Sequence, residues 1–268
     1  MQMKNCSSNK KQKPDNLVQT IERVSLILDI LGQCPQGISV RDLSEKVELP
    51  KGTTHRLLSS LAYFDYVRQD SLNKNYHLGF KLVELGSLLI NHIDFRNEAR
   101  PFMVDLAEKT GETIHLVVLD QNEAFYIDKV VLHQTGLQMV SRVGLRIPLH
   151  CSSVGKILAA YLYEDELNQI FKESSLPRRT PNTITSLSRF KKHLKIIKAQ
   201  GYAIDNEENE KGVGCVAAPI RNGNGEVIAA MSISGPAIRI TPKIIEASLK
   251  DQVCEAALNI SRKLGFRD

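Results

Sequence analysis

The segment from Gly37 to Leu78, GISVRDLSEKVELPKGTTHRLLSSLAYFDYVRQDSLNKNYHL, constrains the fold more than any other part of the chain. It contains two short stretches in which apolar residues recur at helical spacing, with a tight turn at Glu48-Leu49-Pro50 between them. A two-strand pattern with a polar loop follows immediately. This order predicts a helix-turn-helix with a wing, whose usual partner is duplex DNA. The long remainder of the 268-residue chain then needs a second role.

The two helices are predicted from capping residues and apolar spacing. Ser39 can cap the first helix, with Asp42 three positions later as in a capping box. Pro50 cannot continue that helix, but it can precede a second one that begins at Lys51. The buried stripe predicted for the second helix consists of Leu57, Leu58, Leu61 and Phe64.

The opposite face of the second helix is small, polar or cationic, which suits a helix that enters a major groove. The residues predicted to contact DNA from the two helices are Ser39, Lys51, Thr53, Thr54, His55, Arg56 and Ser59. The alternative is a solvated helix face in some other small helical domain. The predicted wing favours DNA, because Arg68 and Lys74 would lie near its tip and could neutralise phosphates. An ordinary surface role for Lys74 stays open.

Composition narrows the class of protein without identifying it. A net charge of +5 is only weakly diagnostic of nucleic-acid binding. No segment resembles a signal peptide or reaches the ~18 apolar residues of a membrane span. Five scattered cysteines without a CxxC pair indicate a reducing compartment and argue against a disulfide framework or a zinc site. A cytoplasmic protein without a membrane contact or a cofactor is therefore expected.

The chain is predicted to divide into four segments. Residues 1–16 form a polar tail, 17–79 the winged helix-turn-helix domain, 80–94 a linker helix, and 95–268 a second domain. The first domain would begin with a supporting helix whose core side consists of Val18, Ile21, Val24, Leu28 and Leu31. The linker helix carries more apolar surface than an exposed connector needs. It packs either against its mate in a dimer or back on its own domain.

The second domain has an α+β pattern. Strands are predicted near 113–120, 124–131, 138–143, 202–205, 216–220 and 227–234. Helices are predicted near 96–110, 154–162, 165–171, 187–199 and 242–264. Asn222-Gly223-Asn224-Gly225 predicts a hairpin turn between the last two strands. Antiparallel strands with helices packed on one side are typical of a sensor domain.

Several motifs of the chain match one family. They are LPKGTTHRLLSSL in the first domain, and SRVG (141–144), PLHCSSVGK (148–156), GYAIDNEENEKGVGCVAAPI (201–220) and SISGP (232–236) in the second. Through these motifs the chain, over about residues 17–266, resembles the IclR family of bacterial transcription regulators. ETIHL (112–116) and DNEENEKG (205–212) resemble the KdgR type within it, which responds to 2-keto-3-deoxygluconate.

The resemblance implies a DNA-binding regulator with a GAF-like effector domain. We expect a repressor that binds palindromic operator DNA as a homodimer or homotetramer and senses a small keto or hydroxy acid. Carried over by motif position, the effector pocket would contain Met139, Arg142, Ile147, Ser153, Val154, Asp205, Cys215, Ser232 and Ser234. Two positions depart from the family pattern: Ser153 stands where Gly or Ala is usual, and Gly52 where a Ser commonly opens the recognition helix.

Taken without the resemblance, the same residues leave alternatives open. Ser232 and Ser234 share one face of a strand, which either lines a pocket or meets water. Asp205 lies in an acidic run of a kind that is usually a solvated face.

His115 resembles a strand-end or surface histidine. The adjacent His150 and Cys151 lack an orienting third group, so we predict no catalytic residue and no metal ligand. The competing function is a metabolite-binding or catalytic domain whose helical head binds protein.

Overall fold

The computed structural model describes residues 14, 16–91, 94–132, 141–172 and 176–267. The chain forms two compact units, one that ends at Ile93 and one that spans Asp94–Asp268. Each unit has a hydrophobic core made of its own residues.

The first unit is a winged helix-turn-helix. Its elements are α1 (Gln19–Gly32), α2 (Val40–Lys46), α3 (Lys51–Tyr63), β1 (Val67–Gln69), β2 (Tyr76–Leu78) and α4 (Lys81–Asn91). Ser39 caps α2 as predicted: its hydroxyl accepts the backbone N–H of Asp42 at 3.2 Å and donates to the Asp42 carboxylate at 2.8 Å. β1 and β2 pair antiparallel, with Arg68 opposite His77, which confirms the wing.

The core of this unit differs from the prediction at the start of α1 and at the end of α3. Val18 and Ile21 are 61% and 62% exposed, because the buried face of α1 lies further along, at Ile27 and Leu31. Phe64 is 62% exposed because α3 ends at Tyr63, so this side chain no longer follows the buried stripe of the helix. These three predicted core positions are wrong.

Helix α4 does not bury its apolar side chains against the described part of the chain. Along it and just before it, five large apolar residues are 41% to 75% exposed: Phe80, Val83, Leu85, Leu88 and Leu89. The structure therefore does not support the alternative in which this helix packs back on its own domain.

The second unit contains one six-stranded antiparallel sheet in the order β5-β4-β3-β8-β7-β6. The strands are β3 (Thr113–Asp120), β4 (Glu123–Val130), β5 (Arg146–Ile147), β6 (Ala203–Asn206), β7 (Val213–Arg221) and β8 (Val227–Pro236). The helical segments are α5 (Asp94–Thr110), α6 (Ser153–Ala160), α7 (Glu164–Lys172), α8 (Leu187–Gln200), α9 (Pro242–Ile244), the π-helical η1 (Ile245–Leu249) and α10 (Lys250–Lys263).

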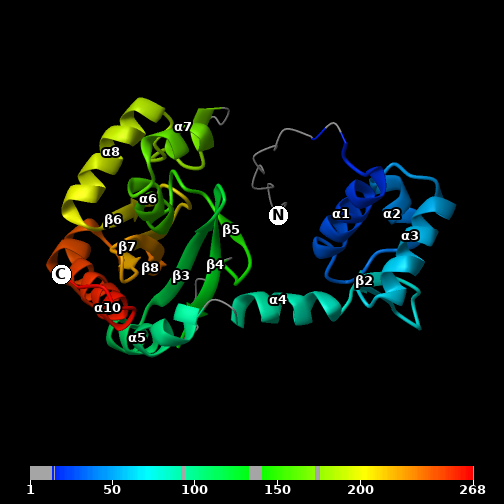
Figure 1. The fold of residues 1–268 in the computed structure, drawn as a ribbon, viewed down its shortest axis with the longest axis horizontal. Helices are drawn as coiled ribbons and strands as arrows, with labels where there is room; N and C mark the ends of the chain where they lie inside the picture. The colour runs from blue at the N-terminus through cyan, green and yellow to red at the C-terminus, as the bar shows by residue number, and fades with distance from the viewer. Residues whose placement is uncertain (1–13, 15, 92–93, 133–140, 173–175, 268) are drawn as a thin grey trace. The chain divides into compact units, whose positions relative to one another are not determined.

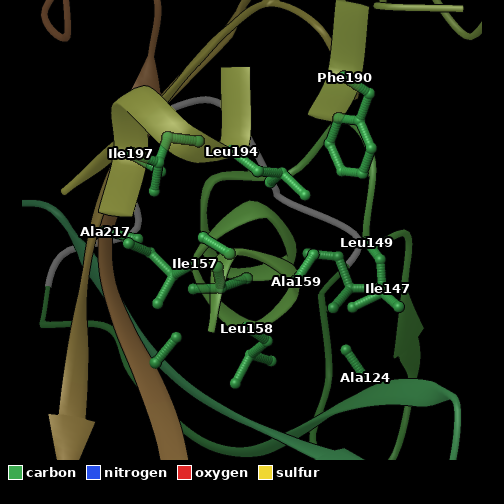
Figure 2. Close-up of a cluster of buried hydrophobic side chains, with 14 of the residues drawn as sticks. Ala124, Ile147, Leu149, Ile157, Leu158, Ala159, Phe190, Leu194, Ile197 and Ala217 are labelled. Carbon is green, nitrogen blue, oxygen red and sulfur yellow. The ribbon is translucent and has the colours of Figure 1, made fainter. Parts of the chain in front are cut away.

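Helices cover both faces of this sheet, so the predicted one-sided arrangement is wrong. α5 and α10 pack against one face, and α6, with α8 outside it, lies on the other (Figure 1). Figure 2 shows the core on the second side, where Ile157 and Leu158 of α6 lie near Phe190, Leu194 and Ile197 of α8. The strands of a two-sided sheet bury both faces, which explains why β7 and β8 are almost continuously buried.

Most predicted strands and helices are present within a few residues of their bounds. The predicted strand at 138–143 is an exception: only 141–143 lie within the described residues, and they are not strand. The two-residue β5 pairs with β4 instead. The hairpin turn at 222–225 is confirmed, with the N–H of Asn222 donating to the carbonyl of Glu226 at 3.0 Å. None of the helices in the described part of the chain has the length and apolar character of a membrane span.

Candidate functional site

The outer face of α3 presents the predicted DNA-contacting side chains. Lys51, His55, Arg56 and Ser59 are exposed, and Thr53 and Ser39 are half-buried. No carboxylate of the described residues pairs with Lys51 or Arg56, so both cations are available to phosphates or base edges. At Gly52 an added Cβ would meet no atom within 4 Å, so a side chain there would have open space.

Thr54 is the exception on this helix. It is fully buried, and its hydroxyl donates to the carbonyl of Pro50 at 3.3 Å. The predicted contact between Thr54 and DNA is therefore wrong, because its side chain points into the core of the unit rather than along the exposed face.

Of the two wing cations predicted near the tip, Lys74 lies there and Arg68 does not. Lys74 lies in the turn, with φ +60°, and its carbonyl accepts a hydrogen bond from the Gln69 side chain at 2.9 Å. Arg68 lies in the middle of β1 rather than at the tip, and its guanidinium is 5.8 Å from the centroid of the Phe80 ring.

The second unit has a partly open cavity of about 170 Å³ between the sheet, the start of α6 and the loop that precedes α8. Seven of the nine residues predicted for an effector pocket line it: Ile147, Ser153, Val154, Asp205, Cys215, Ser232 and Ser234. Arg142 is exposed and does not line the cavity. Met139 lies outside the described residues. The structure thus brings together on one cavity predicted residues that lie far apart in the sequence, from Ile147 to Ser234.

The serine face of β8 turns inward to the cavity. The hydroxyls of Ser232 and Ser234 are 3.2 Å apart and buried, which excludes the alternative that this face meets water. Nδ1 of His115 is 3.2 Å from the Ser234 hydroxyl, and Nε2 is 2.8 Å from the Ser141 hydroxyl.

The prediction that His115 is a strand-end or surface histidine is wrong, because β3 is a central strand and pairs His115 with Ser232. Burial lowers the pKa of His115 to about 3, so the ring is neutral and offers one donor and one acceptor. Tyr126 of β4 completes this wall, with its ring centroid 5.0 Å from that of His115.

Two carboxylates of the acidic run around Asp205 are buried, those of Asp205 and Glu208, whereas Glu207 is half-buried and Glu210 is exposed. The Asp205 carboxylate is 1% exposed and accepts the backbone N–H groups of Glu208 at 2.7 Å and Asn209 at 3.3 Å. Burial raises its pKa to about 7, and the positive charge of Lys156 opposes that shift. Lys156 of α6 is fully buried, and its ammonium donates to the Ile204 carbonyl and to the Glu208 carboxylate.

The start of α6 presents one unsatisfied hydroxyl. Ser152 caps the helix by accepting the N–H of Gly155 at 3.0 Å, and it donates to the carbonyl of Pro148 at 2.6 Å. Ser153, the next residue, is 1% exposed, lines the cavity and has no hydrogen-bond partner for its hydroxyl among the described residues. A Cβ at Gly155 would lie 2.4 Å from the Pro148 carbonyl oxygen, so this close approach requires glycine.

The geometry around Cys151 does not match a nucleophile and its base. The thiol donates to the side-chain oxygen of Asn209 at 3.6 Å, and burial raises its pKa. Nε2 of His150 is engaged elsewhere, 3.0 Å from the carbonyl of Pro177. Within the described residues, no three potential ligands among His, Cys, Asp and Glu converge to hold a metal ion.

Comparison with known proteins identifies two family domains along the chain. Residues 20–71 match the model of the IclR helix-turn-helix domain, and residues 88–262 match that of the bacterial transcriptional regulator IclR C-terminal domain. The chain is 37% identical to the HTH-type transcriptional regulator XynR of Escherichia coli over 93% of this chain and 98% of that protein. It is 36% identical to the regulator KdgR of the same organism over 96% of both chains. These two values do not separate the KdgR type from XynR.

A solved structure shows the same architecture over nearly the whole chain. The crystal structure of Thermotoga maritima IclR superposes with a TM-score of 0.77 at 38% identity, covering 92% of this chain and 99% of that one. Because these relatives are regulators with a helix-turn-helix domain, the alternative of a protein-binding head on a catalytic domain is not supported. The chain belongs to the IclR family of bacterial transcriptional regulators.

Proposed function

We propose that this protein is a repressor whose binding to a palindromic operator is controlled by a small keto or hydroxy acid held in the cavity of the second unit. The observation that carries the proposal is the Ser153 hydroxyl, which is buried, unpartnered among the described residues and part of the cavity wall. A buried hydroxyl without a partner is uncommon in native structures, and a polar ligand would satisfy it.

The start of α6 suits the carboxylate of such an acid. The backbone N–H groups of Ser153 and Val154 lie in the first turn of the helix, where the helix dipole favours a negative charge. Ser232 and Ser234 can donate to the same carboxylate or to a neighbouring keto oxygen.

Asp205 suits the other part of the ligand. A carboxylate would repel the acid group of the effector but can accept hydrogen bonds from its hydroxyls. 2-Keto-3-deoxygluconate satisfies both requirements, whereas pyruvate has no hydroxyl for Asp205. A purely apolar ligand would leave Asp205 and the serines unpaired, at about 1–3 kcal/mol for each buried group.

On the DNA side, the exposed face of α3 is proposed to enter the major groove, with Ser39, Arg68 and Lys74 holding phosphates. A palindromic operator has two-fold symmetry, which a two-fold symmetric dimer matches. The exposed apolar residues of α1 and α4 are the proposed contacts of that dimer, and effector domains would join dimers into a tetramer.

The test is fluorescence anisotropy of full-length protein on a labelled DNA fragment from its own promoter. 2-Keto-3-deoxygluconate should release the fragment from the wild-type protein at a lower concentration than pyruvate. Asp205→Ala should weaken the response to 2-keto-3-deoxygluconate far more than the response to pyruvate.

Asp165→Ala, at an exposed carboxylate on α7, is the matched control and should change neither response. Equal losses for the two acids, or release by an uncharged aromatic compound alone, would contradict this interpretation of the cavity.

A further inference from the structure

We propose that Arg179 selects the carboxylate of the effector, because it is the arginine of the cavity wall that pairs with no carboxylate among the described residues, and it lines the cavity together with Ser153 at the start of α6. This inference rests on the proposed function of the cavity as an acid-binding site. Nothing in the sequence motifs distinguishes Arg179 from its neighbour Arg178.

The guanidinium of Arg179 is only partly engaged. Its Nε donates to the carbonyl of Asn209 at 3.1 Å, and no other partner of the side chain occurs within the described chain. Its two terminal nitrogens are therefore free to donate, while the residue lines the cavity. A planar fork with free N–H donors is the group that pairs best with a carboxylate, through two parallel hydrogen bonds.

The loop that carries Arg179 is held in place by buried threonines. The Thr180 hydroxyl donates to the carbonyl of Glu207 at 2.6 Å, and the Thr183 hydroxyl donates to that of Glu208 at 2.6 Å. The backbone N–H of Arg179 donates to the Thr183 hydroxyl at 3.2 Å. Because this loop is already ordered, binding of a ligand would lose little conformational freedom there.

Asn209 connects Arg179 to the start of α6. While its carbonyl accepts from Arg179, its N–H donates to Asp205 at 3.3 Å and its side-chain oxygen accepts from Cys151 at 3.6 Å. Cys151 directly precedes Ser152, the cap of α6. Through Asn209, Arg179 is tied to Cys151 beside the helix start as well as to Asp205. Because Arg179 and Ser153 line the same cavity, together they would hold one carboxylate.

The other basic residues of the cavity wall do not compete for this role. Nε of Arg146 is 2.9 Å from the Glu123 carboxylate, and its guanidinium lies over the Phe125 ring. His115 carries no charge near neutral pH. An uncharged sugar of the same size would form no ion pair with Arg179, so the site should distinguish an acid from its neutral analogue.

The experiment is calorimetry on the full-length protein with 2-keto-3-deoxygluconate, D-gluconate and pyruvate, each beside its primary amide. The wild-type protein should prefer acid to amide. Arg179→Gln should weaken binding of the acid about 10- to 100-fold, the range expected for a charge-assisted pair, and leave the amide within about threefold. Arg178→Gln is the matched control: this neighbour is exposed as Arg179 is and donates to the carbonyl of Pro181 at 3.0 Å, but it does not line the cavity and should change neither affinity.

An unchanged ratio of acid to amide affinity in Arg179→Gln would overturn the inference and leave the proposed function intact. If none of the acids binds the wild-type protein, the proposed function is itself wrong and the inference falls with it. Binding of the amide shows that a variant is folded. Should Arg179→Gln not fold, Arg179→Met decides: it also removes the charge and the donors, so an unchanged acid preference in that variant also overturns the proposal.

Discussion

At the scale of single residues, buried polar groups define this molecule. Asp205, Lys156 and Glu208 all lie out of water, where an unpaired charge is strongly unfavourable. The pairing of Lys156 with Glu208 stabilises those two groups. Asp205 accepts two backbone N–H groups and lines the cavity. Of the three groups, it is therefore the one whose protonation state depends most on pH and on a bound ligand.

Asp205 should make stability depend on pH in a defined direction. Its folded-state pKa of about 7 lies above the ordinary value of 3.8, so the folded protein binds a proton there that the unfolded chain has released. This contribution to stability is complete below about pH 4 and is lost as the pH rises through about 7. The loss amounts to about 1.4 kcal/mol for each pH unit that separates the folded and unfolded pKa values.

Asp205→Asn should remove that dependence. Denaturant unfolding at pH 5.5 and at pH 8 should show a smaller fall in the free energy of unfolding for the variant than for the wild type. Asp165→Asn, at a carboxylate exposed on α7, should behave as the wild type. Parallel pH profiles for the wild type and Asp205→Asn would show that the Asp205 carboxyl group titrates at its ordinary value.

The sequence predicted seven residues of the cavity but missed His115, Tyr126 and Arg179. The predicted residues were carried over from family motifs, in which the position within the motif indicates that a residue lines the pocket. His115 and Tyr126 enter the site through strand pairing, and Arg179 through Thr180 and Thr183, which dock its loop on the 205–210 turn. Such tertiary contacts have no signature in local periodicity. The alternation of polar His115 and Ser232 with apolar neighbours was the one available signal for a shared inward face.

At the scale of elements, local periodicity predicted the positions of the longer helices and strands. β3 occurs at the predicted residues, and α3 and α8 begin at the predicted ones, since their apolar spacing continues to a cap or turn signal. β5 is two residues long, which is too short for a pattern of alternation, and it forms by pairing with the edge of β4. The side on which helices pack is likewise set by the whole sheet, which is why a one-sided arrangement was predicted wrongly.

The exposed face of α3 yields a prediction of its own. Arg56→Ala should weaken operator binding by about 1–3 kcal/mol if the guanidinium reads a base edge. Because phosphate contacts release counterions, the affinity of the wild type should also fall steeply with salt. Anisotropy titrations at about 150 mM salt, where the Debye length is about 8 Å, measure the local effect. Arg189→Ala removes the same charge from an exposed position on α8 and should leave the affinity nearly unchanged. Identical affinities for Arg56→Ala and the wild type would place Arg56 outside the interface.

At the scale of the whole molecule, the exposed apolar residues of α1 and α4 require an explanation. Monomeric soluble proteins rarely expose large contiguous apolar surface, and a second copy would cover it. Sedimentation at micromolar concentration should show at least a dimer. Leu89→Glu, at a residue that is 69% exposed on α4, should shift that equilibrium toward monomer.

Leu72→Glu serves as the control, because this leucine is also exposed but lies at the tip of the wing. A wild-type protein that sediments as a monomer, with and without DNA, would rule out the proposed dimer.

The separation of the two hydrophobic cores has an evolutionary consequence. The core of the first unit is drawn from Val24 to Tyr76, and the cluster under α6 and α8 from Val117 to Ala230, so the two sets share no residue. A packing mutation in one set therefore destabilises mainly the unit that contains it. Lineages can alter which metabolite is sensed while the operator stays the same, or acquire a new operator while the metabolite stays the same. The specificity for the metabolite and the specificity for the operator can therefore evolve separately.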